Sequence, residues 1–238
     1  MVWERIGAAT GIVFVVLFMI AFGLELHDFP DPGLVGADEI VMFIEAHQTR
    51  LGLVAILYAV SWTAFLWFMG SLRSRLATVE PSQRLSSVAF GAGILIAALS
   101  LVMSGLRAEI VLADFTTAVD AAVTGRWALY DASGGLLGIT PFPRAVILGS
   151  ASLVVLRFGG LPRWLGWLGV VSALVNLAGG FDYLAPSDVT YTGHPLADLF
   201  SFLVWVLLAS GTLVWSASPA SPTAPRVHSG RVGGGVKT

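Results

Sequence analysis

The stretch IGAATGIVFVVLFMIAFGL, residues 6–24, is the first of six apolar stretches that decide the fold of this chain. Each is close to the roughly 20 residues that cross the hydrocarbon core of a bilayer as a helix. The other five cover residues 51–72, 85–106, 136–156, 164–181 and 196–215. The sequence therefore predicts an all-α polytopic membrane protein with six transmembrane helices.

The composition of the chain agrees with a membrane protein. Of its 238 residues, 56% are hydrophobic and 12% are charged, whereas soluble domains carry about 25% charged residues. We expect one transmembrane domain over residues 1–217 and a disordered tail over residues 218–238, which is rich in Ser, Pro and Gly. Because the chain has no cysteine, disulfides and thiolate metal ligands are excluded.

The basic residues alternate between the two sides of the predicted bundle. Nine of the thirteen Lys and Arg residues lie in segments 1–5, 73–84 and 157–163 and in the tail, whereas the opposite connections hold only Arg50, Arg107 and Arg126. Short loops rich in Lys and Arg stay in the cytoplasm. We therefore predict a multi-pass protein of the cell membrane with its N- and C-termini both in the cytoplasm.

Two of the outer connections have apolar residues at helical spacing. In residues 38–49 and again in residues 115–123, apolar side chains recur on one side among acidic and polar ones. This pattern predicts two short amphipathic helices that lie at the outer membrane interface.

Arg144 is the first candidate site residue. It lies in the motif TPFPR, residues 140–144, twelve residues before the inner end of its predicted span, or about 18 Å at 1.5 Å per residue. The two prolines of the motif predict a break in the outer part of this span. An ionisable residue at this depth is a functional candidate by default. The alternative is a structural arginine that pairs with a carboxylate such as Glu109 or Asp198.

The leading functional hypothesis uses these residues together with Asn176 and Asp182. They would line a cavity in the outer half of the bundle, between the fourth stretch and the third, fifth and sixth. A small amphipathic or lipid-like molecule would be bound or transported there, with Arg144 contacting an anionic group. For Asn176, a hydrogen bond to a neighbouring helix is the alternative.

A second hypothesis is a membrane-embedded, metal-dependent hydrolase with an outer-face site. His27, His47 and His194 all fall on the predicted outer side, and Asp198 follows His194 by four residues. Three histidines and one carboxylate can hold zinc, which lowers the pKa of bound water to about 7. Unconnected surface histidines are the simpler interpretation, because the spacing matches no H-E-x-x-H signature. The sequence indicates no other cofactor and identifies no catalytic residue.

A third hypothesis is a non-catalytic accessory subunit, whose spans pack against another membrane protein or a second copy of the chain. In every case the lipid bilayer is the first partner. Nucleic acid is not an expected partner, because the chain has no dense basic face.

The motif LPRWLGWLG, residues 161–169, leads from an inner loop into the fifth stretch. With the layout of Pro30, Ala46-His47 and a second stretch that ends in Leu72-Arg73, it resembles small six-helix membrane protein families of unknown function from actinobacteria and other bacteria. The resemblance implies a six-helix membrane fold. It transfers no catalytic residue, because such families have none established.

The absence of cysteine allows the predicted topology to be tested with single cysteines. In intact cells, an impermeant thiol reagent should label Thr117→Cys and leave Ser74→Cys unlabelled, and permeabilised cells should show labelling of both. Labelling of Ser74→Cys alone in intact cells would invert the predicted orientation.

Overall fold

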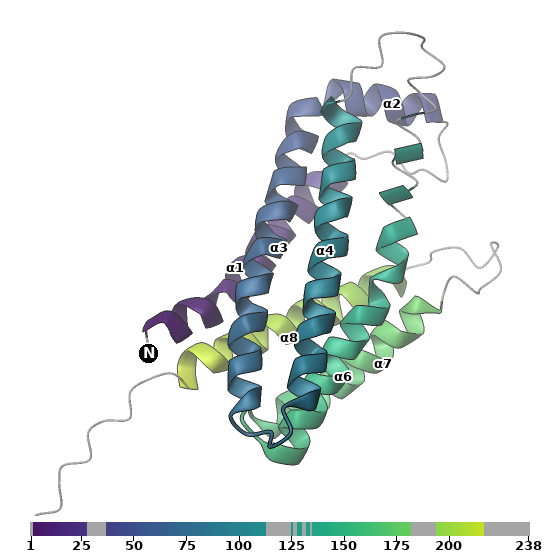
Figure 1. Ribbon diagram of the computed structural model, residues 1–238. Coiled ribbons are helices and arrows are strands. Elements are labelled where there is room, and N and C mark those ends of the chain that lie inside the picture. The colour runs from purple at the N-terminus through teal and green to yellow at the C-terminus, as the bar shows by residue number, and fades with distance from the viewer. Residues whose placement is uncertain are drawn as a thin grey trace, which may run out of the picture.

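The chain is all-helical in this computed structural model, which describes residues 2–27, 37–112, 125, 128–129, 132–133, 135–181 and 194–216 (Figure 1). No strand occurs in these residues, which confirms the predicted all-α fold. The helices are α1 (Val2–Leu26), α2 (Ala37–Ala46), α3 (Gln48–Ala77), α4 (Arg84–Leu112), α6 (Pro141–Phe158), α7 (Arg163–Gly180) and α8 (His194–Ser216).

Within the described residues, five helices are long and apolar enough to cross a membrane. They are Trp3–Leu26, Gln48–Ala77, Arg84–Val111, Gly135–Phe158 and Leu196–Ser216. Helix α7 occupies the predicted fifth stretch but is not among the five, because its 18 residues include Arg163, Asn176 and four glycines. The chain thus has the helices of a multi-pass membrane protein, but the predicted number of six spans is not confirmed.

The six long helices form a closed circuit of neighbours. Consecutive helices pack side by side in the order α1, α3, α4, α6, α7, α8, and α8 returns to pack against α1 (Figure 1). The start of α1 lies beside the end of α8, where the Ser210 hydroxyl donates a hydrogen bond to the Ala8 carbonyl. Both helix ends therefore lie at the same end of the bundle, as an even number of antiparallel helices requires.

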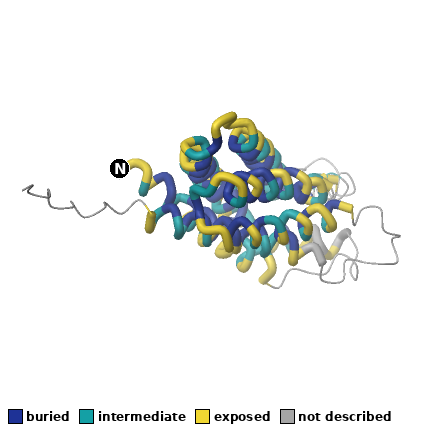
Figure 2. The backbone as a smooth tube through the Cα atoms, turned by 90° about the horizontal axis from the view of Figure 1, so that it is seen from below, coloured by how far each residue is buried: buried dark blue, intermediate teal, exposed yellow. Residues whose placement is uncertain are grey.

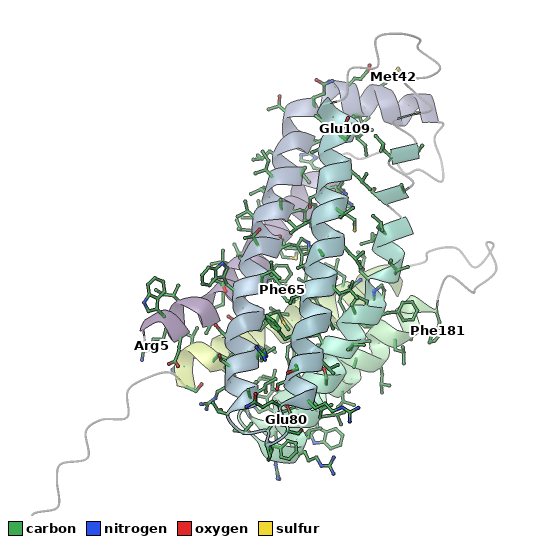
Figure 3. The ribbon with its side chains drawn as sticks, viewed as in Figure 1. Arg5, Met42, Phe65, Glu80, Glu109 and Phe181 are labelled. Atoms are coloured by element: carbon green, nitrogen blue, oxygen red, sulfur yellow. The ribbon has the colours of Figure 1, made fainter. Side chains whose placement is uncertain are left out.

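The two ends of the bundle differ in charge. One end, here called the Arg-rich end, holds both of those helix ends and the α3–α4 and α6–α7 connections; it carries Arg5, Arg73, Arg75, Arg84, Arg157 and Arg163. The opposite end, here called the α2 end, is where α2 lies across α3 and α4 (Figure 1). Helix α2 confirms the first predicted amphipathic helix, since it buries Ile44 and exposes Met42 (Figure 3). The second predicted amphipathic helix and the tail lie outside the described residues.

Aromatic rings fill the bundle between α1, α3 and α8. The Phe14 ring lies 4.9 Å from that of Phe65 and 5.0 Å from that of Trp62, and the Phe65 ring lies 5.7 Å from that of Phe202. Tilted pairs at these centroid distances are favourable for aromatic rings. Figure 2 shows buried residues on the inward faces of the helices and exposed residues on the outward faces. The outward residues include Ile56 at 62% exposure, as lipid-facing helices require.

Four tryptophans stand out on the surface near the Arg-rich end. They are 51% to 83% exposed and are Trp3, Trp164, Trp167 and Trp215. Tryptophan concentrates at membrane interfaces, so exposed tryptophans near helix ends are typical of a membrane protein.

The connection from α3 to α4 is held by Glu80, which is buried. Its carboxylate accepts hydrogen bonds of 2.8 Å from the amides of both Leu85 and Ser86, at the start of α4. Burial raises the pKa of the Glu80 carboxyl, but the hydrogen bonds outweigh this effect and hold the pKa below its ordinary value. A carboxylate in this position also favours the positive end of the helix dipole.

Two glycines of α1 allow close helix packing within the chain. A Cβ on Gly7 would collide with the Ser71 hydroxyl of α3. A Cβ on Gly11 would lie 2.6 Å from the Phe68 ring of α3 and 2.9 Å from the Ser210 Cβ of α8. The G-x-x-x-G spacing of residues 7–11 therefore joins helices of one molecule.

Gly11→Ala should destabilise the bundle by about 1–3 kcal/mol, because the added methyl group overpacks the contact with Phe68 and Ser210. Gly105→Ala in α4 is the matched control, since nothing lies within 4 Å of its Cβ position. The control should keep its stability or gain up to about 1 kcal/mol from the better helix propensity of alanine. Thermal unfolding in one detergent compares the two variants, and an unchanged melting temperature for Gly11→Ala would contradict the packing.

Candidate functional site

A buried polar network joins α6, α7 and α8 near the α2 end of these helices. Its first part comes from the start of α6. Residues 135–139 are helical, Thr140 forms a turn, and α6 begins at Pro141. Thr140 keeps helical backbone angles (φ −65°, ψ −25°), so the predicted break is limited to an interruption of the hydrogen-bond ladder at the prolines. Pro141 is tolerated there because the first residue of a helix needs no amide donor.

Arg144 lies on the first turn of α6 and is only 3% exposed. Its Nη2 donates to the Thr140 hydroxyl at 2.7 Å, and its Nε donates to the Thr140 carbonyl at 3.3 Å. Nη2 also lies 3.2 Å from Oδ2 of Asp198, with which it forms an ion pair. Nη1 of Arg144 is buried and has no hydrogen-bond partner.

Asp198 reaches Arg144 from the first turns of α8. Its side chain is 5% exposed in the ion pair, and its Oδ1 accepts a hydrogen bond of 2.7 Å from the Leu199 amide. The carboxylate lies against the backbone of α7 at Gly179, where a Cβ would come within 3.2 Å of the Asp198 Cβ. A glycine at position 179 therefore leaves room for the ion pair between α6 and α8.

Asn176 adds α7 to the network and is fully buried. Its Nδ2 lies within hydrogen-bond distance of the Ser172 carbonyl (2.9 Å), the Asp198 carbonyl (3.0 Å) and the Ser201 hydroxyl (3.1 Å). Two of these acceptors are on α8, which confirms the predicted contact with a neighbouring helix. Its Oδ1 is buried without a hydrogen-bond partner. The network thus contains one donor, on Arg144, and one acceptor, on Asn176, that no described group satisfies.

A second Arg–carboxylate pair lies at the α2 end of α1, α3 and α4. Nη1 of Arg107 lies 2.8 Å from Oε1 and 2.9 Å from Oε2 of Glu25. The Tyr58 hydroxyl donates to the same carboxylate at 2.7 Å, and the Arg107 guanidinium lies 5.1 Å from the centre of the Tyr58 ring. Both charged side chains are about one fifth exposed.

A small, half-open pocket adjoins this second pair. Its cavity volume is about 40 Å³, which is room for a few water molecules. Helix α2 contributes one wall through Ile44, and the lining residues are Glu25, Ile44, Leu51, Val54, Arg107, Ile110 and Val111. This pocket lies between α1, α2, α3 and α4, and the cavity predicted beside Arg144 stays a prediction.

The remaining predicted ligand-binding residues are placed as follows. Glu109 is exposed near the α2 end of α4 (Figure 3) and is not the carboxylate that pairs with Arg144. Asp182 lies outside the described residues. Of the five predicted ligand-binding residues, the structure therefore brings together Arg144, Asn176 and Asp198.

The predicted metal ligands are not assembled by the residues that the structure describes. His47 is occupied by a hydrogen bond of 2.9 Å between its Nδ1 and the Phe43 carbonyl and by stacking on the Phe43 ring. Asp198 pairs with Arg144, and His27 follows the end of α1. The side chain of His194 lies outside the described residues. No group of three His, Asp or Glu side chains suited to a metal ion occurs in the described part of the chain.

The sequence reasoning did not identify the cluster of Glu25, Tyr58 and Arg107. The sequence does contain an indication of this cluster. Glu25 and Arg107 each directly follow the last residue of an apolar stretch, so each stays on the helix that the stretch forms.

Compared with known proteins, the chain matches no protein-family model, no curated protein and no solved structure.

The Arg144–Asp198 pair can be tested with a double-mutant cycle. Arg144→Ala and Asp198→Asn should each destabilise the protein by about 3 kcal/mol, because each leaves a buried group unpaired. The double variant should recover on the order of 1–3 kcal/mol of the summed loss. Arg144→Ala combined with Glu109→Gln is the matched control and should show no recovery. Thermal unfolding in one detergent gives the coupling; additive losses in the Asp198 pair would show that the two charges do not interact.

Proposed function

We propose that the protein binds a small amphipathic or lipid-like molecule at the α2 end of α6, α7 and α8, and that Arg144 contacts the anionic group of this molecule. The observation that carries the proposal is the buried Nη1 of Arg144, which lacks a hydrogen-bond partner. Unsatisfied buried donors are rare in native proteins and call for an unseen partner. A guanidinium also forms its strongest hydrogen bonds to carboxylate, phosphate and similar anions.

The helices around Arg144 support a binding site. The hydrogen-bond ladder at the start of α6 is interrupted at Pro141 and Pro143, and α7 is only 18 residues long. In membrane transporters, short or proline-interrupted helices are the best indication of where substrate binds.

Apolar surface for the rest of an amphipathic molecule lies on the same helix ends. Phe142 precedes Arg144 by two residues, and its ring packs edge-on against Phe181 at the end of α7, with 5.7 Å between ring centres. Both rings are partly exposed, Phe142 by 37% and Phe181 by 52%. Figure 3 shows Phe181 at the end of α7. The Phe142 ring can approach α7 because Gly180 has no Cβ there. An anionic head at Arg144 and an apolar tail on these rings would both lie at this end of α6 and α7.

The proposal includes an orientation in the cell membrane, with the Arg-rich end and both termini in the cytoplasm. The support is the set of six arginines at that end. The site would then open toward the outer face.

The other two hypotheses have less support. A metal-dependent hydrolase would need ligands that the described residues do not gather. An accessory subunit would need a surface made for protein, but the exposed apolar side chains suit lipid equally well.

The test is to purify the protein in a mild detergent and identify copurifying small molecules by mass spectrometry. An anionic amphipathic molecule should accompany the wild type and be lost from Arg144→Gln, which keeps hydrogen-bonding capacity but removes the charge. Arg107→Gln is the matched control, because it also removes an arginine from an ion pair, and it should retain the molecule. Retention by Arg144→Gln, or no anionic molecule with the wild type, would refute the proposal.

A further inference from the structure

Among the residues that the structure describes, the two charges at the Arg144 site cancel. The guanidinium and the Asp198 carboxylate are 4% and 5% exposed and lie 3.2 Å apart. An anion bound at Nη1 of Arg144 would add a second negative charge to the same buried space. Uncompensated charge in a membrane interior costs several kcal/mol, so the site needs a way to remain neutral when it is occupied.

We infer that the anion enters together with one proton, which Asp198 accepts. This inference rests on the proposed function. The proton comes from the buffered solution and forms an O–H bond on Oδ2 of Asp198, while Arg144 remains charged and its guanidinium passes from the carboxylate to the anion. The charges then sum to zero before and after binding.

The unsatisfied acceptor of the network fits this proton. A protonated carboxyl group donates one hydrogen bond that a carboxylate does not. Asn176 already holds Asp198 through the bond from Nδ2 to the Asp198 carbonyl, and its Oδ1 is buried without a partner. The two unsatisfied atoms of the network thus have complementary roles: Nη1 of Arg144 receives the anion, and Oδ1 of Asn176 receives the hydrogen bond of the protonated Asp198.

The other charged groups on the helices that pack against α8 either have a partner of their own or lie at the opposite end of the bundle. On α1, Glu25 is bound by Arg107 and Tyr58. Those at the Arg-rich end are Glu4 and Arg5 on α1, Arg157 on α6 and Arg163 on α7. His27 follows α1, and His194 precedes Asp198 on α8 itself with its side chain outside the described residues. Asp198 is therefore the described carboxylate that shares the space of Arg144.

Decane-1-sulfonate is a suitable probe, because its charge does not change between pH 5 and pH 8. Calorimetric titration of the protein in a maltoside detergent should show tighter binding at lower pH, by up to tenfold for each pH unit, because the occupied site holds one proton more than the empty site. Titration in buffers of different ionisation enthalpy should give an uptake of about one proton for each sulfonate bound. Decyltrimethylammonium, with the opposite charge, should not bind at the site.

Asp198→Asn mimics the protonated residue. This variant should bind the sulfonate without proton uptake and with little pH dependence, more tightly than the wild type at pH 8, and its melting temperature should rise on binding. Glu25→Gln is the matched control, because it alters the other Arg–carboxylate pair, and it should keep the proton uptake of the wild type. Since the proton count is measured on the wild type, the test stands even if Asp198→Asn folds poorly.

The outcomes separate the two ideas. Sulfonate binding to the wild type with the same affinity at every pH and no proton uptake would overturn the inference and leave the proposed function standing. Failure of the sulfonate to bind the wild type at any pH, or equal binding by Arg144→Gln, would overturn the proposed function and the inference with it.

Discussion

Hydrocarbon offers no hydrogen-bond partner, and this constraint governs how the helices of the chain are built and joined. Each polar side chain that enters the bundle must be satisfied by another helix or by its own backbone. The Ser210 hydroxyl therefore bonds the Ala8 carbonyl across α1 and α8, and Nε1 of Trp205 bonds the Leu165 carbonyl of α7 at 3.1 Å. The two Arg–carboxylate pairs do the same at the α2 end. Such bonds are directional, so they fix the register of helices whose apolar contacts alone would permit sliding.

Glycine makes these directed contacts possible. A Cβ on Gly169 would lie 2.6 Å from Nε1 of Trp205, so the indole reaches the backbone of α7 only because the Cβ is absent. Gly179 plays the same part for Asp198, whose carboxylate passes the backbone of α7 on its way to Arg144. Small and polar residues thus act together in this bundle. The small residues let two helices approach closely, and the polar residues then form hydrogen bonds or ion pairs between them.

The sequence predicted the helices far better than their pairing. A long apolar run has one stable state in a bilayer, so the bounds of the long helices follow from composition alone. The partner of Arg144 did not follow, because Glu109 and Asp198 lie on different helices that both pack near α6, and only their heights along the bundle distinguish them. The pocket beside Glu25 and Arg107 also did not follow from the sequence, because it depends on how α2 crosses α3 and α4, while the cavity predicted beside Arg144 stays a prediction. The relation to actinobacterial six-helix families stays a prediction.

The unequal lengths of the helices affect the membrane itself. Helix α7, with 18 residues, is about 27 Å long, whereas α3, with 30 residues, is about 45 Å long. A hydrocarbon layer of about 30 Å cannot match both. Membrane proteins accommodate such a difference by tilting the longer helices, by thinning the bilayer beside the shorter one, or by both. The short α7 also lines the buried Arg144–Asp198 pair through Gly179, so any adjustment of the bilayer to this mismatch falls beside the helix that packs against the ion pair.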